Sequence, residues 1–202
     1  MKPILSIVAA ALLTAQLAQA QTGQTFDEQT VLAVQTYISV AEVKCMVALT
    51  PAQEQAYASC CAAFHKVVRH AVFVEKDAAA TSLMLIEARQ ALADTLMLML
   101  TEEQRVTYIR NAESGSVKLK TEEKMAAMRE MGEFSQEELG KFYREIYDYF
   151  MLERVVHTLQ KHNIEAAGYK QMPKKPESLS TANKLERLKI SGALTNEHKY
   201  KW

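Results

Sequence analysis

Apolar residues recur at helical spacing along most of the chain, and the alternating pattern typical of strands is almost absent. Six glycines and four prolines in 202 residues leave long runs without a helix-breaking residue. We therefore expect an all-α fold in which helical hairpins form a bundle or cradle. The expected helices span residues 27–48, 51–77, 80–99, 102–113, 122–131, 136–167, 182–190 and 196–202.

The helix expected at 80–99 is the most apolar of these. Its polar residues form a narrow stripe, while the rest of its surface is apolar: Leu83, Leu85, Ile86, Leu92, Leu96, Met97 and, just beyond it, Leu100. Such a pattern predicts a central, largely buried helix.

Glycines and prolines mark the expected helix ends. Four glycines follow helical stretches, where a left-handed cap is needed: Gly115, Gly132, Gly168 and Gly192. Residues 169–180 contain two prolines and lack apolar periodicity, which predicts a linker. We expect a main helical domain over 21–168, followed by this linker and a short, loosely packed helical tail over 169–202.

The first twenty residues have the pattern of a secretory signal peptide. Lys2 precedes an apolar run over 4–15, and Ala18 and Ala20 supply the small residues before a cleavage site. We predict that residues 1–20 are removed after Ala20 and that the mature protein, beginning at Gln21, is exported to the periplasm. Later apolar stretches contain charged residues, so we expect no insertion into a membrane.

Charge is balanced over the whole chain but not along it. The 24 Lys and Arg residues equal the 24 Asp and Glu residues, so no global field steers the protein toward nucleic acid. The tail is locally basic, which fits either a solvated segment or a docking patch. Its basic residues are Lys174, Lys175, Lys184, Arg187, Lys189, Lys199 and Lys201.

One helix-start motif occurs twice with identical spacing. LTPAQ at 49–53 is followed by Tyr57, and LTEEQ at 100–104 by Tyr108. The pattern predicts a capping box, in which the Thr hydroxyl and the Gln side chain each bond the other residue's backbone amide. Weaker copies begin at Phe134 and Leu194. The residue before each cap should pack one turn into the helix, against Leu139 in the Phe134 copy and against the later aromatic residue in the others.

The paired motifs resemble the signature of the Spy/CpxP-like family of periplasmic stress proteins, and the two helices expected between them are similar to that family's hairpin. The resemblance covers about residues 49–112 and is carried by Leu49, Thr50, Gln53, Leu100, Thr101 and Gln104. It implies a cradle-like, frequently homodimeric helical fold that binds unfolded proteins without ATP. It also implies that these six residues have a structural role, anchoring the hairpin.

Catalytic motifs are missing from the sequence. No H-E-x-x-H, G-x-S-x-G, phosphate-loop or C-x-x-C-H pattern occurs. We therefore expect a protein that is not an enzyme and needs no cofactor.

The three cysteines leave several interpretations open, because an odd number in an exported protein allows a free thiol, a link between subunits or a metal site. Cys61 and His65 share a helix face, and Cys45 lies on the preceding helix. These three residues are a candidate metal site, with ordinary burial of cysteine as the alternative. The disulfide pairing of Cys45, Cys60 and Cys61 stays open.

Two apolar segments are candidate partner surfaces, with core packing as the competing interpretation. Their residues are Met125 and Met128 in one segment, and Phe142, Ile146, Tyr149 and Phe150 in the other. Together these features predict an exported, non-enzymatic helical binding protein of the cell envelope, and the resemblance to the Spy/CpxP-like family implies that it is an ATP-independent stress chaperone or modulator. A metal-binding or metal-responsive envelope protein and an interaction protein for one dedicated partner are the alternatives.

Overall fold

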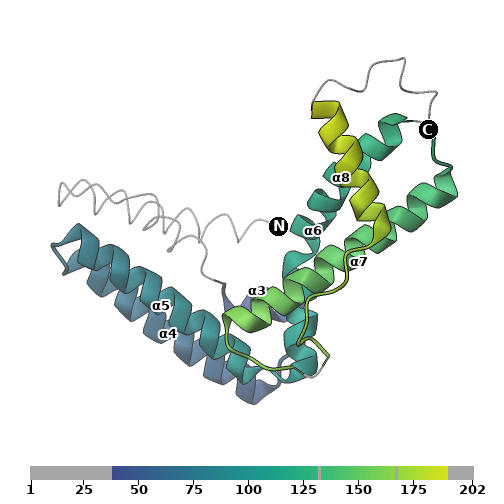
Figure 1. Ribbon diagram of the computed structural model, residues 1–202. Helices are drawn as coiled ribbons and strands as arrows, with labels where there is room; N and C mark the ends of the chain where they lie inside the picture. The colour runs from purple at the N-terminus through teal and green to yellow at the C-terminus, as the bar shows by residue number, and fades with distance from the viewer. Residues whose placement is uncertain (1–37, 132, 167, 191–202) are drawn as a thin grey trace. The chain divides into compact units, whose positions relative to one another are not determined.

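The computed structural model describes residues 38–131, 133–166 and 168–190. This part of the chain contains six α-helices and no strand, which confirms the all-α fold (Figure 1). The helices are α3 (Val40–Met46), α4 (Pro51–Phe73), α5 (Ala78–Met99), α6 (Glu102–Met131), α7 (Gln136–Lys161) and α8 (Glu177–Ile190). The expected signal peptide, Gly132, Gly192, the Leu194 copy of the motif and the helix expected at 196–202 lie outside the described residues.

The chain divides into two compact units, of which the first ends at Gln104 and the second begins at Arg105. The division falls inside the range 21–168, for which we expected one main domain. In the described part of either unit, no helix is long and apolar enough to cross a membrane.

The first unit is built on a hairpin of two antiparallel helices, α4 and α5, which lie side by side (Figure 1). Its turn end is fixed by two polar contacts. The buried Thr81 donates its hydroxyl to the carbonyl of Ala71 over 3.2 Å. The Asp77 side chain caps α5 by accepting from the amide of Ala80.

The expectation that α5 is largely buried is wrong. Leu85, Leu92, Leu96 and Met97 are buried, but Leu83 and Ile86 are exposed. The reason is that α4 is the helix packed extensively against α5 in the described structure, and one neighbour covers only one stripe of a helix.

The second unit contains most of α6 together with α7 and α8. Residues 102–113 and 122–131, expected to be separate helices, belong to the single helix α6, and Gly115 lies inside it. A continuous buried stripe spaced by three or four residues runs along this helix: Val117, Thr121, Met125 and Met128. Thr121 makes the stripe hard to recognise in the sequence, but its hydroxyl donates to the carbonyl of Val117 at 2.8 Å.

The ends of α7 and α8 also differ from expectation. Helix α7 ends at Lys161, and Asn163 rather than Gly168 adopts a positive φ, of 54°. Asparagine is the residue other than glycine that most readily takes this conformation. Helix α8 begins at Glu177, within the expected linker.

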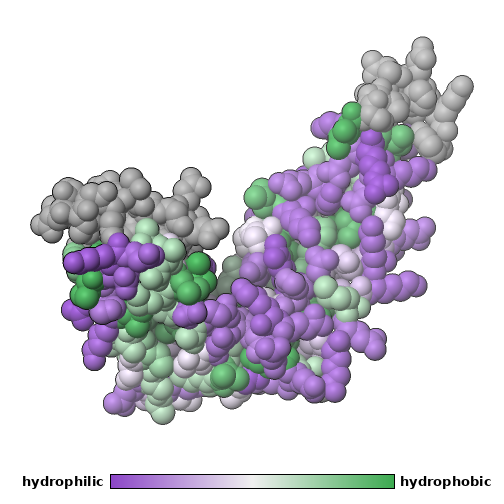
Figure 2. All heavy atoms as spheres, turned by 60° about the vertical axis from the view of Figure 1, so that its left-hand side comes forward, coloured by the Kyte–Doolittle hydropathy of each residue, from purple (hydrophilic) through white to green (hydrophobic). Residues whose placement is uncertain are grey.

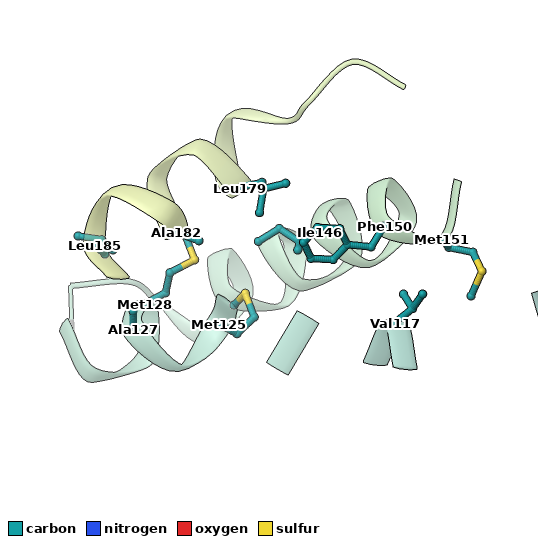
Figure 3. Packing of buried hydrophobic residues seen from close by; sticks show 10 residues of the cluster. All are labelled: Val117, Met125, Ala127, Met128, Ile146, Phe150, Met151, Leu179, Ala182 and Leu185. Carbon is teal, nitrogen blue, oxygen red and sulfur yellow. The ribbon is translucent and has the colours of Figure 1, made fainter. Parts of the chain in front are cut away.

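The core of the second unit joins all three of its helices. Met125 and Met128 of α6 are turned toward Ile146 of α7 and Ala182 of α8 (Figure 3). Leu179 and Leu185 add further apolar contacts from α8. The last described helix is thus packed more closely than the sequence predicted.

Candidate functional site

Both L-T-x-x-Q motifs form the predicted capping boxes. Thr50 Oγ1 accepts from the amide of Gln53 at 3.3 Å, and Gln53 Oε1 accepts from the amide of Thr50 at 2.9 Å. Thr101 and Gln104 make the same two bonds, at 3.2 and 3.0 Å. The motifs therefore begin α4 and α6 in the same way, as their identical spacing predicts.

The two glutamines also bind each other and the opposite motif. Gln53 Nε2 donates to Gln104 Oε1 at 2.9 Å, and Gln104 Nε2 donates to Gln53 Oε1 at 3.2 Å. The same nitrogens donate to backbone carbonyls across the pair, Gln53 to Met99 at 3.0 Å and Gln104 to Ala48 at 2.8 Å. We call this set of contacts the glutamine clasp.

The two glutamines of the clasp make equivalent contacts, which explains why both positions are glutamine. Ala48 and Met99 each stand two positions before the capping threonine of their own motif, so each glutamine reaches the equivalent carbonyl of the other motif. Every amide oxygen in the clasp accepts two bonds and every amide nitrogen donates two. A glutamate at the same position could accept from its own cap but has no hydrogen to donate across the pair.

Other helix starts in the chain confirm this distinction. Ser135 and Glu138 form a capping box at the start of α7, and within the described part of the chain this box makes no cross-pair contact. A further box, which the sequence analysis missed, joins Ser39 to Glu42 at the start of α3. Its S-x-x-E pattern was the signal that could have revealed it. Both of these ordinary boxes use glutamate.

The aromatic residues of the two exact motif copies are buried. Tyr57 is buried, and its hydroxyl donates to the carbonyl of Ile38 at 2.9 Å. Tyr108 is buried as well. At the third copy, Phe134 packs edge-on against Phe142, with ring centroids 5.4 Å apart. In this copy we expected Phe134 to contact Leu139, and the structure places its ring against Phe142.

The hairpin above the clasp carries exposed apolar side chains that the sequence did not predict. On the part of the molecule that contains it, hydrophobic side chains lie among hydrophilic ones at the surface (Figure 2). The large exposed residues of α4, α5 and their turn are Phe73, Val74, Leu83, Ile86 and Leu98. We call this set the hairpin apolar surface.

The partner surfaces predicted from the sequence lie elsewhere and are largely buried. Met125, Met128 and Ile146 have no exposed side-chain area, and Phe150 is buried too. Phe142 and Tyr149 are half-buried and pack against the same core. Core packing, the competing interpretation, therefore describes these residues, because α6, α7 and α8 use them to cover one another.

The candidate metal site is not assembled either. Cys45 and His65 are exposed, whereas Cys61 is buried. Among the described residues, no group of three or more His, Cys, Asp or Glu side chains is placed to hold a metal ion. Cys45, Cys60 and Cys61 form no disulfide with one another.

Comparisons of the whole chain with protein-family models, curated proteins and solved structures found no match. The resemblance to the Spy/CpxP-like family, carried by the six residues of the paired motifs, stays a prediction. The function is therefore inferred from the chain's own residues.

Proposed function

We propose that the mature chain is an exported, non-enzymatic helical binding protein that acts as an ATP-independent envelope stress chaperone or modulator. Its clients are unfolded polypeptides, and they bind at the hairpin apolar surface. This surface is the observation that carries the proposal. Exposed apolar side chains carried by one helical hairpin offer contacts for apolar segments of another chain.

The clasp supports the proposal by fixing the hairpin at its open end. Gln53 and Gln104 hold the first residues of α4 and α6 together, while Thr81 closes the turn end. The hairpin can therefore present apolar side chains on a helix pair that is already ordered before a client binds. Preorganisation of this kind reduces the entropy that binding costs.

Aggregation of an unfolded client tests the proposal directly. We expect the mature protein to slow light scattering by a chemically reduced client, without ATP, at a several-fold excess over the client. Because the contact is apolar and the chain has a formal net charge of zero, the effect should depend only weakly on salt. No suppression at this excess would contradict the proposal and favour a single dedicated partner.

Matched variants locate the activity. Leu83→Gln should reduce suppression, because Leu83 is 57% exposed on α5 and belongs to the hairpin apolar surface. Leu119→Gln is the control, because Leu119 is 63% exposed on α6, in the second unit, and should leave suppression unchanged. Equal loss in both variants would place the client site elsewhere.

A further inference from the structure

A basic groove lies along α8 in the second unit. Its cavity measures about 480 Å³ and is lined by Lys175, Ser180, Asn183, Lys184, Arg187 and Leu188. Three of these side chains are cationic and none is acidic. The groove therefore combines a volume within the usual range for small-molecule sites with a lining whose charged side chains are all positive.

Two of the cationic side chains that line the groove take no part in the ion pairs of α8. Lys189 pairs with Glu130 at 2.8 Å, and Glu186 pairs with Lys124, but neither of these α8 residues lines the groove. Lys175 and Arg187, which do line it, form no ion pair within the described residues. Like charges that share a cavity repel one another, and a bound anion removes that repulsion.

The helix geometry brings the donors of the groove together. Ser180, Lys184 and Arg187 are spaced by four and three residues, so they follow one another along one face of α8. Side chains on a helix lean toward its N-terminus, which is the end of α8 nearer to Ser180 and Lys175. The positive end of the helix dipole lies at the same end.

We propose that this groove binds the phosphoryl group of a small molecule or a lipid headgroup. Arg187 offers a planar guanidinium that can donate two parallel hydrogen bonds to one phosphoryl group. Lys175 and Lys184 supply compact positive charges, and the Asn183 amide adds a neutral donor. A doubly charged group with three acceptor oxygens matches this set better than a single carboxylate. The proposal does not depend on the chaperone function.

Calorimetric titration of the full mature protein with inorganic pyrophosphate tests the site. We expect saturable binding that Arg187→Gln weakens about tenfold or more, because a charge-assisted bidentate contact is lost. Arg89→Gln is the matched control, because Arg89 is exposed on α5 in the first unit. Circular dichroism melts of both variants show that each remains folded.

Sedimentation with vesicles distinguishes the two sources of the phosphoryl group. Binding to phosphatidic acid vesicles that Arg187→Gln abolishes would identify a lipid headgroup, whereas binding of pyrophosphate alone would identify a soluble ligand. Absence of binding in both arms, or equal binding by Arg187→Gln and Arg89→Gln, would overturn the proposal. A glutamate-rich peptide that bound as tightly as pyrophosphate, with the same dependence on Arg187, would also overturn it in favour of an acidic protein segment.

Discussion

At the residue scale, the clasp uses more hydrogen-bonding groups of glutamine than a helix cap does. Gln104 accepts from the amide of Thr101 and also donates to Ala48 and Gln53. The cap can use a carboxylate, as Glu138 does at the start of α7, but the contact across the pair needs an N–H donor.

The change Gln104→Glu separates these two roles. We expect it to preserve the cap but to lower the free energy of unfolding by about 1–3 kcal/mol, because a carboxylate would face the Ala48 carbonyl and the Gln53 amide oxygen. Urea denaturation measures the loss. In the control, Glu138→Gln, only an exposed cap is altered, and the loss of stability should be clearly smaller. Equal effects of the two changes would mean that the clasp adds nothing beyond capping.

The Ser135 cap gives a prediction about pH. Hydrogen bonds from the backbone amide and the side chain of Ser135 lower the pKa of Glu138 below its ordinary value. A depressed pKa in the folded state means that the contribution to stability is present at neutral pH and is lost as the pH falls through that pKa. An NMR titration should show this low pKa, and Ser135→Ala should return it toward the ordinary value. An unchanged pKa in that variant would show that the cap is not its cause.

At the element scale, the sequence predicts what is decided locally. The capping boxes of Thr50 and Ser135 were predictable, because a cap and its partner lie three residues apart and meet in any helix that begins there. The clasp was not, because Gln53 and Gln104 meet only after α4 and α5 have formed an antiparallel pair. The prediction that α5 is largely buried was wrong for a similar reason, since apolar composition does not reveal how many helices pack against a given helix.

Gly115 tests the continuity of α6. It lies within the helix, has no positive φ, and a Cβ added there would meet nothing within 4 Å. Gly115→Ala should therefore raise the free energy of unfolding by about 0.5–1 kcal/mol, because alanine gains helix propensity without a clash. A thermal melt measures the change. Destabilisation would indicate instead that the chain ends a helix at this glycine, as the sequence predicted.

At the scale of the whole molecule, one apolar pattern can mean a core or a partner surface. Methionines and aromatic residues at helical spacing look alike in both cases, which is why the sequence left both interpretations open for residues that belong to the core of the second unit (Figure 3). The two cases differ in whether another helix packs over the apolar stripe. Here α8, expected as a loose tail, contributes Leu179 and Ala182 to that cover.

Replacing one methionine distinguishes the two cases. Met128→Ala should lower the free energy of unfolding by about 2–5 kcal/mol, because the side chain is fully buried and its removal leaves a cavity. The exposed Leu119 provides the control, and Leu119→Ala should change stability by less than about 0.5 kcal/mol. Chemical denaturation followed by circular dichroism compares the two. A negligible loss in Met128→Ala would restore the interpretation of this residue as surface.

The clasp has a consequence for how the hairpin could be re-engineered. Because Gln53 bonds the carbonyl of Met99 and Gln104 bonds that of Ala48, the chain enters and leaves the hairpin at the same point. The contacts of the clasp lie at the open end of the hairpin, so they do not depend on the length of α4 and α5, provided that both helices change by matching lengths. The length of the hairpin can therefore be changed without changing how the hairpin is attached. Added turns of helix would carry a longer apolar surface, and fewer turns a shorter one.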